Sequence, residues 1–178
     1  MNVFQTITNK AAEARLHFLV IGGYAVMAHG FVRSTEDLDL LVRKSQRARW
    51  QTLLEGAEMT VHHDGGTFLQ FNAPPWGKLP VDLMFVPDEV FDRMQVKADK
   101  TKFEGQEVGV VSLLQLIALK CHAVRNTKGL RILKDTDDLI HLIQNNGLDL
   151  QEPELRATIL THGNQELYDK LQRACAPD

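Results

Sequence analysis

The sequence has little of several features that define other classes of protein. It contains only two cysteines among 178 residues, Cys121 and Cys175, and their spacing fits neither a disulfide framework nor a zinc site. No apolar run approaches the ~20 residues that a transmembrane helix needs, and no N-terminal signal-peptide pattern is visible. We therefore expect a cytoplasmic protein in which Cys121, within an apolar helical run, is a small core residue.

The chain also lacks a strong charge and the best-known phosphate-binding motifs. Its net charge of −3 gives no general attraction to nucleic acid, so contact with RNA or DNA would need a local basic patch. The patterns G-x-G-x-x-G and G-x-x-x-x-G-K-[ST] are both absent, which disfavours a Rossmann dinucleotide site and excludes a P-loop. With 44% apolar and 24% charged residues, the composition is that of an ordinary globular protein.

The character of the sequence changes at Ser112, which forms a capping box with Gln115 at the start of a helix. Every periodic segment beyond Ser112 is helical, whereas strands alternate with short helices before it. The predicted strands and hairpins lie at 17–21, 37–42, 58–62, 67–72, 81–86 and 97–111. This order predicts an α+β fold with a boundary between residues 111 and 112.

Two acids alternate with apolar residues in Asp37-Leu38-Asp39-Leu40, and a third, Asp82, lies in a later apolar run. Side chains at i and i+2 of a strand share a face, about 6.5–7 Å apart along the chain. Carboxylates so placed repel each other and lose hydration. Mg²⁺ removes both problems because it binds carboxylate oxygens and keeps sites open for phosphates. The alternative is an ordinary alternating strand with its acids in water.

A glycine pair, Gly22-Gly23, lies between a predicted strand and a predicted helix. Glycine there would let a phosphate approach the backbone amides closely, although a tight turn explains the pair equally simply. Arg33 follows between the glycines and the first acids. It could hold a phosphate or form a salt bridge with Glu36.

The helical part carries a second set of charged residues. Lys120 has apolar neighbours, so its ammonium group either reaches solvent or meets an anion. Asp138 lies four residues after Lys134 and could pair with it. Asp135 could pair with Arg131 or with a basic residue of the preceding helix, which would lock the two helices together.

Three further features have a simple structural interpretation that we favour. His62-His63-Asp64 could bind zinc, but at the tip of a hairpin such residues are more often solvated. Trp76, in a Pro-Pro loop, could stack on a base, but we expect it to cover the edge of the core. Ser45 is expected to cap a helix that runs to about Glu55.

The glycine pair, Asp37-Leu38-Asp39 and Asp82 together resemble the signature of the nucleotidyltransferase fold, which DNA polymerase β and aminoglycoside nucleotidyltransferases share. The segment Ala28-His29-Gly30-Phe31-Val32-Arg33-Ser34-Thr35-Glu36-Asp37 is similar to one in bacterial AbiEii/AbiGii-type toxins and their relatives. The same families have a Lys…Arg…Lys-Asp-x-x-Asp-Leu run, which this chain resembles over residues 120–139.

The resemblance implies a nucleotidyltransferase-like small mixed β-sheet with helices in residues 1–111, and a C-terminal helical segment, residues 112–178, packed on it. It implies transfer of an NMP from an NTP, such as ATP, onto a hydroxyl acceptor with release of pyrophosphate. Two Mg²⁺ ions, with Mn²⁺ as a substitute, would lie at Asp37, Asp39 and Asp82, and Asp82 would also be the candidate general base. The implied nucleotide-binding residues are Gly22, Gly23, Arg33, Lys120 and Arg125.

The acceptor is not written in the sequence. The resemblance leaves open a tRNA end, a protein side chain or a small molecule, and the toxin-like relatives add an antitoxin as a partner. Two other functions are also compatible with the residues. One is a catalytically silent module that binds a nucleotide or a partner. The other is a phosphatase-like hydrolase that uses the same metals.

Overall fold

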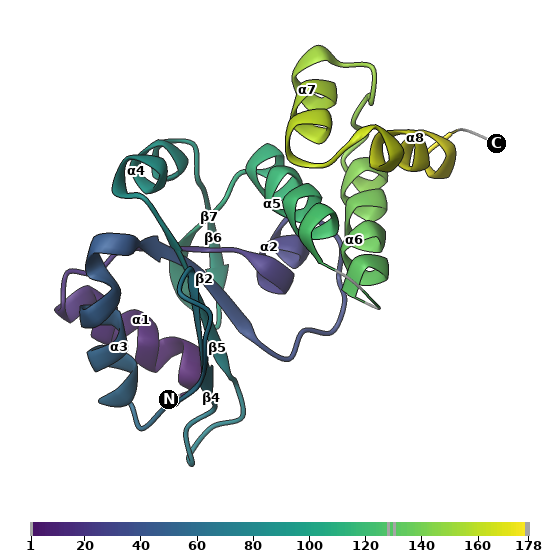
Figure 1. The fold of residues 1–178 in the computed structure, drawn as a ribbon. Coiled ribbons are helices and arrows are strands. Elements are labelled where there is room, and N and C mark those ends of the chain that lie inside the picture. The colour runs from purple at the N-terminus through teal and green to yellow at the C-terminus, as the bar shows by residue number, and fades with distance from the viewer. Residues whose placement is uncertain (1, 128, 130, 177–178) are drawn as a thin grey trace. The chain divides into compact units, whose positions relative to one another are not determined.

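A computed structural model describes residues 2–127, 129 and 131–176, and within them a seven-stranded sheet in the order β3-β4-β5-β2-β1-β7-β6 (Figure 1). The sheet is mixed. Strand β2 is parallel to β5 and β1 is parallel to β7, while the other neighbours are antiparallel. The predicted α+β fold with a small mixed sheet is therefore confirmed.

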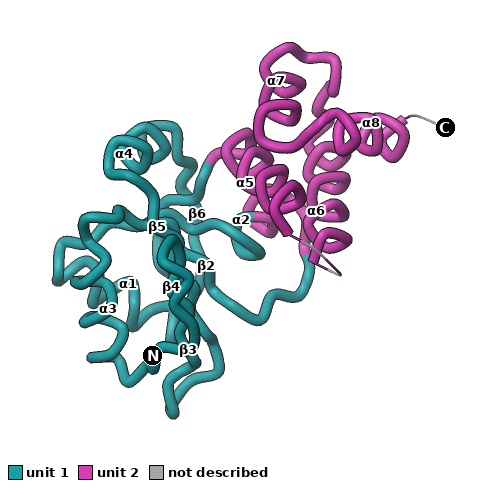
Figure 2. The backbone as a smooth tube through the Cα atoms, in the orientation of Figure 1, with its two compact units in different colours: residues 1–25, 33–111 teal, residues 26–32, 112–178 magenta. Residues whose placement is uncertain are grey.

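The chain forms two compact units, which Figure 2 colours separately. The first unit consists of residues 1–25 and 33–111, and the second of residues 26–32 and 112–178. The short segment 26–32 thus belongs with the C-terminal helices, although it lies early in the sequence. That residues 1–111 and 112–178 act as a catalytic domain and a helical segment packed on it stays a prediction.

The first unit holds the sheet, the start of α2 and three further α-helices among the described residues. Its elements are α1 (Val3–Glu13), β1 (Phe18–Val20), α2 (Gly22–Ala28), β2 (Leu38–Arg43), the 3-10 turn η1 (Lys44–Gln46), α3 (Arg47–Glu55), β3 (Thr60–Asp64), β4 (Phe68–Asn72), β5 (Val81–Val86), α4 (Asp88–Val96), β6 (Asp99–Phe103) and β7 (Gln106–Val110). The second unit holds the end of α2 with α5 (Leu113–Asn126), α6 (Arg131–Asn145), α7 (Pro153–His162) and α8 (Gln165–Ala174).

The side chains of β2 alternate between the two faces of the sheet. Leu40 and Val42 are fully buried, and Val42 lies opposite Phe18 of β1. The ring of Phe18 meets that of Trp50 in α3 edge-on, with 5.9 Å between centroids. Helix α3 therefore covers this face, while Asp39, between the apolar positions, points to the other face.

Ser45 has a different role from the one predicted. It lies within the 3-10 turn, and α3 begins after Gln46 without a side-chain cap. The Ser45 hydroxyl donates to Asp88 Oδ2 at 2.5 Å and its amide donates to Oδ1 at 3.2 Å. These two bonds favour the charged carboxylate and lower the pKa of Asp88. Ser45 thus ties the end of β2 to the start of α4, so the predicted helix cap is wrong.

The helical unit has its own core. The capping box of Ser112 and Gln115 begins α5 as predicted. Cys121 is fully buried within a cluster that includes Leu139 and Ile159 of the neighbouring helices, and burial raises the pKa of its thiol to about 12. Cys121 is therefore a core residue, as expected. None of the described helices is both long enough and apolar enough to span a bilayer.

Residues 26–32 are held on α6 by specific contacts. The side-chain amides of Asn145 and Asn146 donate to the carbonyl oxygens of Gly30 and His29, each at 2.9 Å. The ring of Phe31 stacks on His141 with 3.9 Å between centroids. These contacts explain why the chain leaves the sheet-containing unit after Ala25 and joins the helical unit.

Candidate active site

The three acids singled out from the sequence lie together where β2 and β5 begin. Asp39 and Asp82 are direct partners in the parallel register, and Asp37 immediately precedes β2. One carboxylate oxygen from each residue lies within 4.8 Å of the others, and all three side chains are half-buried. Among the described residues, no other group of His, Cys, Asp or Glu gathers in this way.

The predicted zinc alternative has no such geometry. His62, His63 and Asp64 are exposed on β3, in agreement with the solvated interpretation. Asp64 forms a salt bridge with Arg47 at 2.6 Å. That bond and one from the Gly66 amide lower the pKa of Asp64, the backbone bond being the larger cause.

Two neutral side chains orient the acids. Gln70 of β4 lies opposite Asp82 in the antiparallel register, and its Nε2 donates to Asp82 Oδ2 at 2.5 Å. The hydroxyl of Thr35 donates to Asp37 Oδ1 at 3.2 Å. The contact of Gln70 with Asp82 could not be predicted from the sequence. Alternation along a strand gives the face on which a residue lies, but not its partner on the next strand.

The donor set fits a hard divalent cation. Three carboxylates whose oxygens approach within 4.8 Å repel one another, and hydrogen bonds from neutral groups cannot cancel their charge. Oxygen-only ligands from carboxylates suit Mg²⁺, Mn²⁺ or Ca²⁺ better than zinc or copper. Asp37, Asp39 and Asp82 are therefore the residues that could hold a metal, whose identity the geometry leaves open.

The glycine pair makes room for the protein's own side chains. Gly22 has φ +60°, and a Cβ there would overlap the carboxylate of Asp39. A Cβ at Gly23 would overlap the hydroxyl of Thr35 and would lie 3.4 Å from Arg33 Nη1. The close approach that only glycine permits thus brings the start of α2 against the acids, in addition to any space it leaves for a phosphate.

Arg33 lies beside this turn. Its Nη1 donates to the carbonyl oxygen of Ser34 at 2.9 Å, and its guanidinium faces Gly23. The structure therefore brings Arg33 and the glycine pair into the neighbourhood of the triad. Their binding of nucleotide stays a prediction.

Lys120 lies in the helical unit and has two carboxylate partners. Its Nζ contacts Asp135 Oδ1 at 2.7 Å and Asp138 Oδ2 at 2.6 Å. The side chains of all three residues are less than a tenth exposed, and Arg131 Nε lies 3.9 Å from the other oxygen of Asp135. Lys120 thus joins α5 to α6, as one of the interpretations of Asp135 predicted.

Arg125, the other basic residue predicted to contact nucleotide, is also on α5. Its Nη1 donates to the carbonyl oxygen of Thr161 in α7, with a long distance of 3.4 Å. Both basic residues therefore have partners inside the helical unit. Contact of Lys120 and Arg125 with a nucleotide stays a prediction.

Trp76 does not cover the core as expected. It is 43% exposed, whereas Trp50 is fully buried. The loop buries Pro74 instead, and Pro75 is exposed like Trp76. The interpretation of Trp76 as a core residue is therefore wrong.

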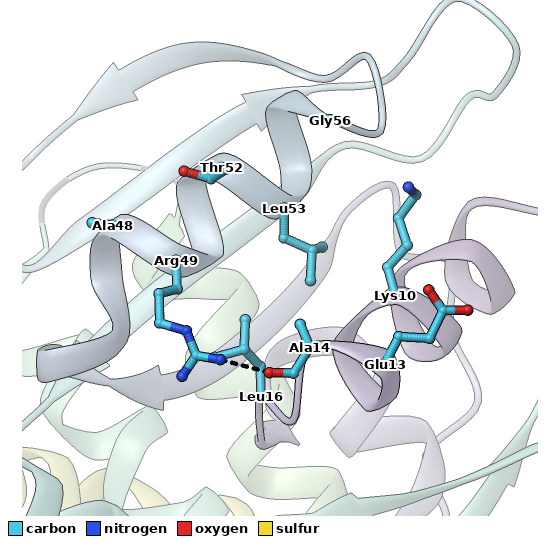
Figure 3. A pocket seen from close by; sticks show the side chains of 9 residues that line it. All are labelled: Lys10, Glu13, Ala14, Leu16, Ala48, Arg49, Thr52, Leu53 and Gly56. Carbon is cyan, nitrogen blue, oxygen red and sulfur yellow. Dashed lines mark hydrogen bonds between the residues drawn. The ribbon is translucent and has the colours of Figure 1, made fainter.

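A groove of about 630 Å³ between α1 and α3 lies away from the acids (Figure 3). Arg49 crosses it and donates to the carbonyl oxygen of Ala14 at 2.6 Å. Lys10 and Glu13 line it from α1. Because α3 covers the sheet face opposite Asp39, this groove is no part of the carboxylate site.

The mixed sheet, with Asp39 and Asp82 on adjacent parallel strands and Asp37 directly before β2, has the nucleotidyltransferase fold, as its similarity to solved structures of that class shows. The antibiotic-resistance factor ANT(2'')-Ia has a TM-score of 0.65 at 16% identity, over 96% of this chain and 93% of that one. A nucleotidyltransferase-like antigen from Paracoccidioides brasiliensis has 0.56 at 18%, over 98% and 94%. The lincosamide adenylyltransferase LnuA has 0.56 at 13%, over 78% and 93%. No curated protein sequence gives a significant match.

A family model places the chain more narrowly than its fold does. Residues 8–175 match the family described as nucleotidyl transferase AbiEii toxin, type IV TA system. Since this match spans nearly the whole sequence, the chain belongs to the AbiEii family and is a nucleotidyltransferase. The resemblance inferred from the glycine pair and the acids is thereby confirmed.

Replacing Gly22 by alanine tests whether the glycine makes room for Asp39. Gly147, with φ +59° and nothing within 4 Å of an added Cβ, is a matched control for Gly22 with φ +60°. Both variants should lose about 1 kcal/mol of stability from backbone strain. Only Gly22→Ala should also weaken divalent-metal binding, because it displaces the carboxylate. Urea unfolding and calorimetric titration with Mn²⁺ would measure the two effects, and equal metal affinity in both variants would contradict this account.

Replacing Lys120 by methionine tests the buried ion network. The change leaves Asp135 and Asp138 buried without their shared cation, so the free energy of unfolding should fall by about 3–5 kcal/mol. Adding Asp138→Asn should restore part of that loss. Lys134→Met, an exposed lysine on α6, is the control and should change stability little. Denaturant unfolding measures all three, and similar stabilities for Lys120→Met and Lys134→Met would show that the network contributes nothing.

Proposed function

We propose that the protein transfers an NMP from an NTP onto a hydroxyl acceptor in a Mg²⁺-dependent reaction. The observation that carries the proposal is the convergence of three carboxylate oxygens within 4.8 Å in a chain of a nucleotidyltransferase family. Asp37 and Asp39 would be metal ligands, and Asp82 would be a metal ligand that also accepts the proton of the acceptor hydroxyl.

The chemistry is an in-line displacement at the α-phosphorus. The acceptor oxygen forms the new bond, the bond from the α-phosphorus to the bridging oxygen breaks, and pyrophosphate leaves with that oxygen. When bound, Mg²⁺ would neutralise charge on the phosphates and lower the pKa of the attacking hydroxyl.

The chain's own residues complete the proposed site. Gln70 and Thr35 hold the carboxylates that they contact, so the metal ligands are oriented before substrate binds. The turn at Gly22-Gly23 and the guanidinium of Arg33 are the proposed phosphate contacts beside the acids. Lys120 and Arg125 complete the proposed set of nucleotide-binding residues.

Replacing Asp37 by asparagine should abolish transfer without unfolding the protein. A lost metal ligand should reduce label transfer from an α-³²P-labelled NTP by at least about 100-fold. The melting temperature should stay the same or rise, since one repelling charge is removed. Asp99→Asn, an exposed acid of β6, is the control for charge and should keep full activity.

The outcomes of this assay separate the candidate functions. Transfer that survives in Asp37→Asn would rule out the proposed metal site. Consumption of NTP without labelled acceptor would identify a hydrolase. If the wild-type protein in a cell extract gives neither pyrophosphate nor labelled product, the silent binding module is the correct function.

We also propose a biological role as the toxin of a toxin–antitoxin pair, supported by the name of the family. Induced expression of the wild-type chain should slow the growth of its host, and Asp37→Asn at the same protein level should not, because the transfer reaction would be the cause. Growth curves with immunoblots would measure this. Equal growth with both proteins would exclude a toxic transfer reaction, and rescue by a neighbouring gene would identify the antitoxin.

The acceptor is the remaining half of the reaction. Among proteins of this fold, ANT(2'')-Ia has been seen with adenylyl-2''-tobramycin and LnuA with lincomycin. Both examples are small molecules, whereas the family name alone leaves a tRNA end or a protein side chain equally open. A charged pocket beside the triad bears on this choice.

A further inference from the structure

A pocket of about 760 Å³ lies within the first unit, at the end of the sheet where β2 and β5 begin. Its wall includes residues that adjoin, along the chain, the glycine pair and the acids. Tyr24 directly follows the glycine pair, Glu36 directly precedes Asp37, and Pro80 lies two residues before Asp82. The pocket is therefore lined by chain neighbours of the triad, and the triad itself does not line it.

Specific interactions connect the pocket to the triad. Thr35 lines the pocket, and its hydroxyl lies 3.2 Å from Asp37 Oδ1. The pKa of Tyr24 is raised, first by burial and then by the charges of Glu104 and Asp37. The smaller, electrostatic cause of the raised pKa thus comes from one carboxylate of the pocket wall and one of the triad.

The pocket is negatively charged. Glu36 and Glu104 line it with Lys78 as the opposing charge. Glu104 is held in place, because Asn2 Nδ2 donates to its Oε2 at 3.1 Å and Gln5 Nε2 donates to its carbonyl oxygen at 2.9 Å. A triphosphate would be repelled from such a wall, so the pocket is poorly suited to the nucleotide.

The same pocket carries aromatic surface. Trp76 lines it and is 43% exposed. The ring of Tyr24 packs on Phe4 and Phe103, with centroid distances of 6.2 Å and 5.4 Å, so that it is fixed by its neighbours. Aromatic faces and carboxylates both attract cations, and their combination favours an ammonium group over a neutral one.

We propose that this pocket binds the acceptor, and that the acceptor is a small hydroxylated amine with at least one protonated amino group. This inference rests on the proposed transfer reaction, which supplies the need for a hydroxyl near the triad. The volume is in the range of small-molecule sites. The negative wall disfavours an RNA strand, whose phosphates it would repel.

The test uses two cyclitols of similar size and different charge. We would titrate ¹⁵N-labelled full-length protein, without nucleotide or metal, with 2-deoxystreptamine, a hydroxylated diamine, and with neutral myo-inositol. The indole N–H signal of Trp76, assigned with a Trp76→Phe variant, should shift with 2-deoxystreptamine and stay unchanged with myo-inositol. The signal of the buried Trp50 should not move with either compound.

Charge variants measure the contribution of the pocket wall. Glu104→Gln should weaken binding of 2-deoxystreptamine by roughly three- to tenfold, as expected for loss of one partly solvated charge. Glu107→Gln removes the same charge from β7 of the same hairpin, outside the pocket, and should leave the affinity unchanged. Equal weakening in both variants would contradict a specific role for Glu104.

Failure of this inference can be distinguished from failure of the proposed function. Equal shifts with both cyclitols, or no shift with 2-deoxystreptamine, would overturn the amine pocket. Labelled-NTP transfer onto tRNA or protein would in that case leave the transferase intact. Binding of 2-deoxystreptamine with the predicted loss in Glu104→Gln supports the pocket, even if labelled NTP shows no transfer and the proposed reaction fails.

Discussion

Repulsion among three carboxylates is the constraint on which the proposed site depends. Side-by-side parallel strands place Asp39 and Asp82 directly opposite each other, a position that like charges disfavour. The fold accepts this arrangement because the apolar face of β2 is buried under α3 and fixes the register. Hydrogen bonds from Gln70 and Thr35 orient the acids without neutralising them. The remaining negative charge is what makes the site suitable for a divalent cation.

The helical unit also holds neighbouring carboxylates, and there a lysine side chain balances their repulsion. Asp135 and Asp138 are more deeply buried than the triad, and Lys120 lies between them. The side-chain cation of Lys120 makes that cluster a structural link between α5 and α6, whereas we propose that the triad holds an exchangeable metal ion. In this proposal the two clusters differ in the source of their positive charge, which is a lysine side chain in one and a metal ion in the other.

Much of the sheet and of the carboxylate site could be predicted from the sequence, because both depend on local patterns. Alternation in Asp37-Leu38-Asp39 fixes which side chains share a face, and the strand 81–86 coincides with β5. The partners of these residues could not be predicted, since they follow from strand register and from contacts between distant segments. Gln70 lies opposite Asp82 only because β4 pairs with β5 in one register. The exposure of Trp76 likewise depends on how its loop packs and not on its residue type.

The segment 26–32 limits how the helical unit can be replaced or removed. It leaves the sheet-containing unit after Ala25, two residues beyond the glycine pair, docks on α6 through Asn145 and Asn146, and returns at Arg33. The backbone thus passes between the units three times, at residues 25–26, 32–33 and 111–112. A recombination or truncation at residue 112 would remove the helices that hold Phe31. The helical unit is therefore not an exchangeable cassette, and homologous helices could replace it only if they also accommodate this early segment.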